Sequence, residues 1–481
     1  MQSNKVVLKM QNIFRATLRV FKSNPGCFSG MSTGELSESY HHDDTCLTKE
    51  ASLYIHWPYC LKRCSYCNFN KYIPKDNNNH IMTQCLLRET ETLLQLSQVS
   101  CITSVFFGGG TPSLAHPSTV SALLELVSRR VGLADTTEVT LEVNPTPEGR
   151  SKLKDFSQAG VNRFSIGVQS LQQESLKLLG RDHSPKQAVQ TIEEARRLCP
   201  GRVSVDVIFG RPNQTLQSWE AELSELLMLS DQHVSLYQLT PERGTLLFKQ
   251  LQGGEVALPD EHQMAEMYES ARRMLQEHGF QQYEVSNFAR HNAVSHHNMN
   301  YWKARQYIGV GPGAHGRFVP LAEGGVQREA RTQTLEPDQW IREVRQMGHG
   351  TRRRILLGRL ELLEEALVMG LRTTEGITHE DWQLFSPQLD LGDIFGSSAD
   401  VQDFFHGCSL ILDDKGLRCS RDGLALLDSM LPTLLLELER KIPQPPKESC
   451  TDLTARHLCL SHLLQCTSRS AAGSSAGATV H

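Results

Sequence analysis

The sequence of 481 residues lacks several features that would identify the class of the protein directly. It has no run of eighteen or more apolar residues, so we expect no integral membrane span. Its net charge of −5 shows no basic excess, which removes the electrostatic case for nucleic-acid binding. Its 13 cysteines are scattered rather than concentrated in a small domain, which argues against a disulfide framework. The remaining composition is that of a globular protein with two or three domains.

The N-terminal segment contains no acidic residue before Glu35. Apolar residues recur there at spacings of three and four, and the basic residues lie mostly on the opposite side of the implied helix: Lys5, Lys9, Arg15, Arg19 and Lys22. This basic, amphipathic composition predicts a mitochondrial presequence over residues 1–34. A solvated N-terminal tail is the alternative. Residues 441–481 are rich in proline and then in serine, alanine and glycine, so we expect a flexible tail there.

Cys60, Cys64 and Cys67 form a C-x3-C-x2-C run. Three thiolates this close in sequence can hold one soft metal centre, and a four-iron cluster bound by three cysteines leaves one iron open for another ligand. A zinc site needs a fourth ligand, which His56 could supply, but no second pair of ligands follows. The triplet therefore favours an iron–sulfur cluster. An open iron is what radical chemistry with S-adenosylmethionine (SAM) requires.

Buried-strand patterns alternate with helical patterns through the middle of the chain. The expected strands cover residues 53–56, 104–107, 138–143, 163–168, 203–209 and 233–239, and the expected helices cover 81–96, 118–130, 185–198 and 216–229. Such alternation predicts an α/β fold in which helices cover a parallel sheet. About six such units precede residue 280, so we expect a partial (β/α)6 barrel rather than the usual closed barrel of eight.

Polar or glycine-rich residues stand at the end of five successive expected strands. After the cysteine loop come Gly108-Gly-Gly-Thr-Pro, Glu142, Gln169 and Asp206. Reactive residues collect at the C-terminal ends of the strands in parallel α/β proteins, so we expect these side chains to share one site. Bare glycine backbone can approach a ligand closely. Asp206 lies between two valines and needs a partner, for which a ligand or Arg181 would serve.

These motifs, with Tyr54-Ile-His-Trp-Pro-Tyr before the first cysteine, Gly167-Val-Gln-Ser and Asp206-Val-Ile-Phe-Gly, resemble the radical SAM proteins of the coproporphyrinogen III dehydrogenase type. The resemblance covers roughly residues 50 to 430 and is strongest to the HemW branch. It implies that Cys60, Cys64 and Cys67 hold a [4Fe–4S] cluster whose fourth iron takes SAM. By the same analogy the SAM pocket would be formed by Tyr54, Tyr66, Gly109, Gly110, Thr111, Glu142, Gln169, Arg181 and Asp206.

The sequence departs from the dehydrogenases at one position, where Phe69 replaces a further cysteine. This departure puts coproporphyrinogen oxidation in doubt, so enzymatic activity stays open. The segment starting at His297 matches the H-N-x-x-Y-W motif of HemW proteins, and its imidazole could ligate haem iron. A histidine-rich loop that caps a strand is the alternative. The resemblance implies a haem chaperone that delivers haem to a mitochondrial, respiratory acceptor; the alternative is an oxygen-independent coproporphyrinogen III dehydrogenase that uses a 5′-deoxyadenosyl radical.

The expected domain order is a presequence (1–34), a radical SAM partial barrel (46–290), a connecting segment with the H-N-x-x-Y-W motif (291–354), a C-terminal winged-helix-like α+β module (355–440) and the tail (441–481). We interpret the glycine-rich segment 307–316 as a loop that closes the barrel mouth. In the C-terminal module we expect a hairpin at 410–419 and a helix at 425–438 that Pro432 kinks or splits. Cys199-Pro200 is interpreted as a helix end rather than a haem motif.

Overall fold

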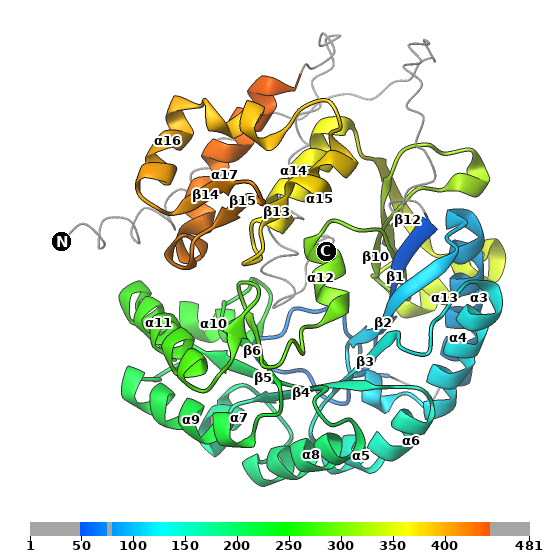
Figure 1. Ribbon diagram of the computed structural model, residues 1–481. Coiled ribbons are helices and arrows are strands. Elements are labelled where there is room, and N and C mark those ends of the chain that lie inside the picture. Colours follow the sequence, from blue (N-terminus) through cyan, green and yellow to red (C-terminus); the bar gives the residue numbers. More distant parts are fainter. Residues whose placement is uncertain (1–48, 75–78, 443–481) are drawn as a thin grey trace.

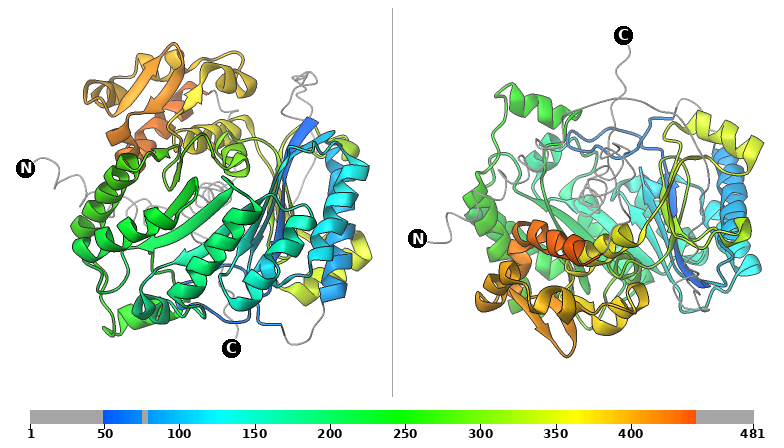
Figure 2. Two further views of the ribbon diagram at one scale, coloured as in Figure 1. Left: turned by 60° about the horizontal axis from the view of Figure 1, so that its bottom comes forward. Right: turned by 90° about the horizontal axis from the view of Figure 1, so that it is seen from above.

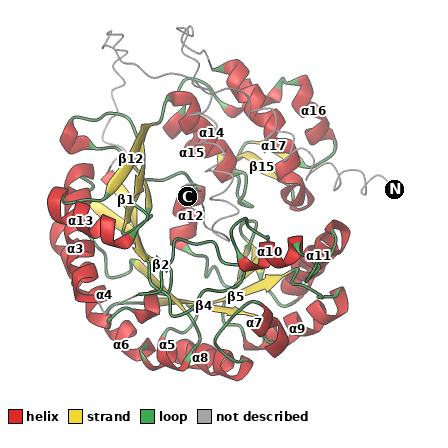
Figure 3. Cartoon of the chain, turned by 180° about the vertical axis from the view of Figure 1, so that it is seen from behind, coloured by secondary structure: helices red, strands yellow, loops and turns green. Residues whose placement is uncertain are grey.

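The computed structural model describes residues 49–74 and 79–442. Its centre is a curved sheet of six parallel strands that follow one another in chain order, with helices on the outer side (Figures 1 and 3). All six predicted strands are confirmed, because β-branched and aromatic side chains suit a sheet that is buried on both faces. The strands are β1 (Glu50–Trp57), β2 (Cys101–Gly109), β3 (Glu138–Val143), β4 (Arg163–Gln169), β5 (Val203–Phe209) and β6 (His233–Gln238).

The outer helices of the barrel include all four that the sequence predicts. Several begin at clear capping residues; Ser184, for example, forms a capping box with Gln187 and is followed by Pro185. The short helices between β3 and β4 and after β4 were not predicted. The bounds are α3 (Asn79–Ser97), α4 (Pro117–Arg130), α5 (Pro147–Ser151), α6 (Leu153–Gln158), α7 (Gln173–Leu178), α8 (Pro185–Leu198), α9 (Leu216–Leu229), α10 (Leu246–Gln252) and α11 (Glu261–Glu277).

Both edges of the parallel sheet are extended by shorter strands, which gives 12 strands in total. Strand β9 (Tyr307–Val310) lies parallel to β1, and β10 (His315–Phe318), β11 (Glu329–Gln333) and β12 (Thr351–Leu356) follow antiparallel, with α13 (Pro337–Met347) before β12. At the other edge β8 (Asn287–Ala289) pairs with β6 and with β7 (Gln281–Gln282). The predicted closing loop at 307–316 is therefore wrong. It is a hairpin whose glycines permit close contact, since a Cβ on Gly309 would meet the His315 carbonyl oxygen at 1.8 Å.

Helix α12 (His296–Trp302) lies across the end of the barrel where the parallel strands begin, and Figure 1 shows it within the ring of helices. Its first residues contact the starts of β3 and β4. Glu138, the first residue of β3, accepts hydrogen bonds from the N–H groups of His296 (3.3 Å) and His297 (3.1 Å). Arg163, the first residue of β4, forms an ion pair with Glu138 at 3.4 Å. The helix thereby closes the barrel at the end opposite the cysteine loop.

The C-terminal module has its own hydrophobic core and lies beside the barrel (Figure 2). A three-stranded antiparallel sheet, β13-β15-β14, is surrounded by helices, which confirms the predicted α+β module and its hairpin. Pro432 does not split the last helix, so of the predicted kink or split the split is wrong. The bounds are α14 (Arg359–Gly370), β13 (Ile377–Thr378), α15 (His379–Phe385), α16 (Ala399–His406), β14 (Leu410–Asp413), β15 (Gly416–Cys419) and α17 (Arg421–Lys441).

The predicted presequence lies outside the described residues, and so does the predicted C-terminal tail except for residues 441 and 442. Across 49–74 and 79–442, no helix has the length and apolar character needed to cross a membrane.

Candidate cluster and SAM site

The three cysteines lie in an irregular loop that follows β1 and is fastened at both ends. The Tyr72 N–H donates to the Pro58 carbonyl (2.8 Å), and the Ser65 N–H donates to the Leu179 carbonyl (3.0 Å). Gly180 has φ +70°, and a Cβ there would meet the Ser65 nitrogen at 3.1 Å. Only glycine adopts this conformation without strain while it lets the loop approach so closely. The loop geometry therefore depends on α7 and its end as well as on β1.

The thiols stand among hydrogen-bond donors. The Thr111 hydroxyl donates to Cys60 Sγ at 3.3 Å, and Arg181 Nη1 donates to Cys64 Sγ at 3.6 Å. Burial raises the pKa of Cys60 to about 11, so the free thiol stays protonated at neutral pH. Iron bound to sulfur would ionise it, and donors aimed at the sulfurs stabilise the negative charge of a thiolate cluster. The donor set thus fits an iron–sulfur cluster.

A single metal ion fits less well. Within the described residues no three His, Cys, Asp or Glu side chains converge on one ion position. Each cysteine of a four-iron cluster binds a different iron, so the three sulfurs need not meet at one point. The zinc alternative also lacks His56, because His56 Nε2 bonds the Asn70 carbonyl oxygen (2.8 Å) and its Nδ1 bonds the Tyr54 hydroxyl (3.1 Å).

All thirteen predicted site residues line one cavity of about 410 Å³ that runs from the cysteine loop into the barrel. The strands bring together residues that are far apart in sequence, as the strand-end argument predicts. The predicted residues that line this cavity are Tyr54, Cys60, Cys64, Tyr66, Cys67, Gly109, Gly110, Thr111, Glu142, Gln169, Arg181, Asp206 and His297.

Backbone conformations at two strand ends are unusual. Gly109 has φ +109°, and a Cβ there would meet the His56 ring at 2.6 Å. Its N–H points at Glu142 Oε2 (3.2 Å). Gln169 adopts φ +62°, a left-handed conformation that costs a non-glycine residue about 1 kcal/mol or more. A β-bulge in the β4–β5 pairing accompanies it, and the bulge directs the amide side chain into the cavity.

Two carboxyl groups face the cavity, and burial raises the pKa of both. The pKa of Glu142 rises to about 8 because of burial and then because of the nearby Asp206. Burial also raises the pKa of Asp206, while hydrogen bonds from serines oppose the rise. Ser165 Oγ donates to Asp206 Oδ2 at 2.8 Å, and Ser204 Oγ donates to Oδ1 at 3.2 Å. These carboxyl groups line a cavity whose lining also includes cationic side chains.

Arg181 is one of the cations that line the cavity. Its Nη2 donates to Asn144 Oδ1 (2.8 Å) and to the Gly167 carbonyl oxygen (2.9 Å), in addition to the contact with Cys64. The interpretation of Arg181 as the partner of Asp206 is therefore wrong. Its Nε is buried without a hydrogen-bond partner, and Arg181 also lines the cavity. Such an unsatisfied donor beside a cavity is suited to an anionic ligand group.

His297 lies at the far end of the cavity, in α12, and not in a histidine-rich loop. Its Nδ1 is 2.9 Å from Ser104 Oγ, and its Nε2 is 3.2 Å from the Tyr301 hydroxyl. The ring also stacks on Phe106 at 4.9 Å between centroids. Burial lowers the pKa of His297 to about 3, so the imidazole is neutral. A neutral ring is the form that ligates iron, but Tyr301 must move before Nε2 can do so.

The sequence argument missed a second polar layer, formed by residues near the starts of the strands: Ser104, Glu138, Arg163, Ser204 and His233. The available signal was a charged or polar residue at the first or second position of an otherwise apolar strand, since such a residue needs a buried partner. Glu138 pairs with Arg163, and Ser204 pairs with His233. The other partners of Ser104, Glu138, Arg163 and His233 come from segments after residue 280 and could not be located from spacing.

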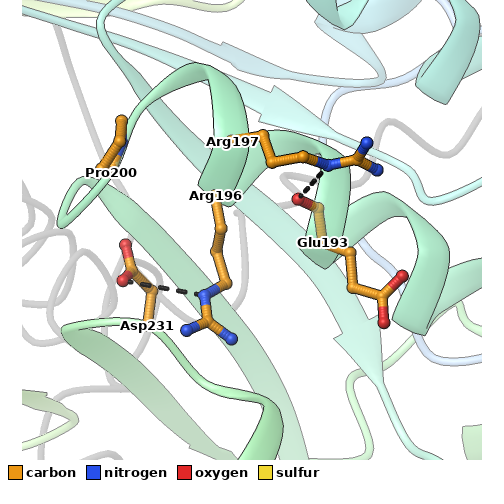
Figure 4. A pocket seen from close by; sticks show the side chains of 5 residues that line it. All are labelled: Glu193, Arg196, Arg197, Pro200 and Asp231. Carbon is orange, nitrogen blue, oxygen red and sulfur yellow. Dashed lines mark hydrogen bonds and ion pairs between the residues drawn. The ribbon is translucent and has the colours of Figure 1, made fainter.

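A separate depression of about 470 Å³ lies on the outer surface beside the end of α8 (Figure 4). Its five lining residues are mostly charged; Arg196, for example, extends toward Asp231 at 3.9 Å. Cys199 caps α8 and Pro200 follows it, which confirms the predicted helix end. None of the five lines the large cavity, so this depression is not part of the cofactor site.

Comparisons with known proteins agree with this geometry. Residues 54–226 match the model of the Radical SAM superfamily, and residues 357–426 match the HemN C-terminal domain. The structure of coproporphyrinogen III oxidase (HemN) from Escherichia coli has a TM-score of 0.66 and 18 % identity, and it covers 82 % of this chain and 91 % of that chain. At this identity the likeness shows the fold alone. Fold and site together define a radical SAM protein.

The relatives specify the family more closely. The radical S-adenosyl methionine domain-containing protein 1, mitochondrial, of Danio rerio is 66 % identical over 81 % of this chain and 88 % of that protein. The protein of the same name in Bos taurus is 57 % identical over 82 % and 89 %. Heme chaperone HemW of Bacillus subtilis is 34 % identical over 68 % and 84 %. The chain belongs to the family of the mitochondrial radical S-adenosyl methionine domain-containing protein 1, to which the HemW proteins are related. The predicted mitochondrial location is confirmed, because these similar relatives are mitochondrial proteins.

Proposed function

We propose that the chain is a haem chaperone of the HemW type, which binds haem and delivers it to a haem-accepting mitochondrial protein. A [4Fe–4S] cluster and SAM are its resident cofactors. The observation that carries the proposal is the replacement of a cysteine by Phe69, which lines the cavity beside the cluster loop. The 34 % identity to a bacterial heme chaperone supports the same function.

In this proposal Cys60, Cys64 and Cys67 hold the cluster. A bound cluster supplies one electron to the sulfonium of SAM. The chain's own groups would bind and orient SAM: the bare backbone of Gly109 and Gly110 would hold its methionine part, and polar and aromatic side chains would hold the remainder (Tyr54, Tyr66, Thr111, Glu142, Gln169, Arg181 and Asp206). The presequence and the expected domain boundaries are part of the same proposal.

We propose that the C-terminal module covers the cavity that holds the cluster and SAM. Met369 of α14 lines the cavity together with residues of the barrel. Lys303 and Arg305, which follow α12, form ion pairs with Asp381 of α15 at 3.6 and 2.5 Å. These contacts tie the cover to the segment that carries His297.

A second candidate is an oxygen-independent coproporphyrinogen III dehydrogenase. It is favoured by one observation, the complete set of SAM-pocket residues around a single cavity. A carrier that needs no radical would have little use for such a pocket. The loss of the cysteine at position 69 argues for the chaperone.

An anaerobic assay of the cluster-reconstituted protein separates the two candidates. The chaperone predicts haem binding and transfer to an apo-acceptor without turnover of coproporphyrinogen in the presence of SAM and a reductant. Turnover would refute the chaperone-only function. Phe69→Cys serves as a matched variant, because it restores the cysteine of the dehydrogenases and should leave haem transfer unchanged.

A further inference from the structure

A continuous buried chain of hydrogen bonds connects α12 to the acidic wall of the cavity. The Ser295 N–H donates to the Tyr283 hydroxyl at 3.3 Å, and that hydroxyl is 2.8 Å from His233 Nε2. On the other side of the ring, His233 Nδ1 is 2.7 Å from Ser204 Oγ. Ser204 Oγ in turn donates to Asp206 Oδ1 at 3.2 Å. The chain therefore ends on a carboxyl group that lines the cavity.

The direction of this chain follows from its first member. The Tyr283 oxygen already accepts the Ser295 N–H, and the phenol hydrogen is buried and needs an acceptor. Among the described residues, His233 Nε2 is the acceptor that the structure places beside it. Burial keeps the pKa of His233 well below its usual value, so the ring is neutral and carries its one hydrogen on Nδ1. Nδ1–H then donates to Ser204, so the Ser204 hydroxyl hydrogen does not go to the ring and can go to Asp206 Oδ1 at 3.2 Å; Ser235 Oγ, at 3.1 Å, is the other neighbour of this hydroxyl.

We propose that His233 is a positioning residue whose Nδ1–H, acting through Ser204, holds Asp206 as an ionised acceptor for the hydrogen-bond donors of bound SAM. The opposite tautomer would take the hydrogen of Ser204 for itself and remove one donor from Asp206. The inference rests on the proposed SAM site and adds a residue to it. Together with Ser165, which donates to Oδ2, Ser204 supplies a donor to each carboxylate oxygen.

The charged and titratable groups around Asp206 determine its ionisation, which the hydrogen-bond chain through His233 and Ser204 then favours. Arg163 on β4 lowers the pKa of Asp206, whereas Glu142 on β3 and Asp206 each disfavour ionisation of the other. On β6 the Tyr237 phenol faces Asp206 and His233 is neutral, so neither adds charge. Because burial already opposes ionisation, the loss of one hydroxyl donor is expected to raise the pKa of Asp206 further.

The test is SAM binding to the cluster-reconstituted protein, measured by calorimetry at about pH 6 and about pH 8.5, because the loss of a donor makes Asp206 easier to protonate at the lower pH. His233→Gln places its amide near Nε2 and removes the donor to Ser204, so SAM should bind about tenfold more weakly at the lower pH and recover at the higher pH. His233→Asn places an amide near Nδ1 and should stay within about twofold of the wild type. Ser204→Ala removes one hydroxyl and should reproduce the His233→Gln profile.

Three results would overturn the inference: wild-type affinity in His233→Gln at both pH values, an equal loss at both, or no rescue by His233→Asn. Ser204→Ala decides the matter if the His233 variants do not fold, since the loss of one hydroxyl leaves the packing intact. If the wild-type protein does not bind SAM, the proposed SAM site itself is refuted. The measurement on the wild-type protein alone shows this, so it is distinguishable from a failure of the inference about His233.

Discussion

The two ends of the barrel treat their buried polar groups in opposite ways. Where the strands end, Glu142 and Asp206 face a cavity and Arg181 keeps an unsatisfied donor. Where the strands begin, Glu138 and Arg163 pair with each other; the first residues of α12 donate to Glu138, and the segment just before α12 accepts hydrogen bonds from Arg163. Polar groups left open at one end indicate a ligand, whereas polar groups satisfied by the protein itself indicate structure. The comparison separates residues that bind from residues that hold the binding site in place.

The largest expected effect is at the open end. Cys64→Ala removes one of the three predicted cluster ligands, so the reconstituted variant should lose most of its iron and acid-labile sulfide. Metal analysis after anaerobic reconstitution measures both. Cys408→Ser is the matched control, because Cys408 is exposed in the C-terminal module and should change nothing. Full iron content in Cys64→Ala would contradict the assignment.

At the closed end the main expected effect is on stability. Glu138→Gln leaves the buried Arg163 without its counter-ion and weakens the start of α12, which should cost about 3–5 kcal/mol of unfolding free energy. Urea denaturation monitored by circular dichroism measures the loss. Glu174→Gln breaks an exposed ion pair with Lys177 and should cost less than about 0.5 kcal/mol. An equal effect of the two substitutions would remove the distinction between the ends of the barrel.

The pH dependence of stability sharpens the same comparison at Glu142. The pKa of Glu142 in the folded protein, about 8, lies above the ordinary value of 4.5. The contribution of this group to the unfolding free energy is therefore fully present below about pH 4.5 and is lost as the pH rises through about 8. Glu142→Gln should remove this decline in the protein without bound ligand. We expect a difference of about 1–2 kcal/mol after discounting for the solvent in the cavity. Parallel stability curves for the two proteins from acid to alkaline pH would contradict the raised pKa.

The open end could be predicted from the sequence because its information is local. Glu142 and Gln169 lie at the ends of recognisable strands and Asp206 lies in the middle of one, and parallel strands bring such residues together whatever the details of the loops. The closed end could not be predicted, because its contacts join distant segments. The bond from the His297 N–H to Glu138 spans 159 positions, and His233 meets Tyr283 through a loop after α11.

The glycine-rich hairpin shows a different limit. Val310, Gly311 and Gly313 have the composition of a loop, and the sequence carries no signal that β9 would pair with β1 across 250 residues. Glycine at 309 is compatible with a strand there only because the partner backbone of β10 approaches closely. Local composition predicts a turn correctly but does not tell whether strands stand on either side of it.

The smallest expected effect tests whether His297 binds a ligand or only stabilises the closed end of the barrel. Tyr301→Phe removes the hydroxyl that occupies His297 Nε2, which should cost about 1 kcal/mol of stability. If His297 is the haem ligand, the freed nitrogen should also bind haem iron several-fold more tightly, whereas His297→Ala should weaken binding, both measured by absorbance titration with haem. If His297 only supports the closed end, both substitutions lower stability and neither changes haem affinity. That result would remove His297 from the haem site and leave it with Glu138 and Arg163 as part of the scaffold.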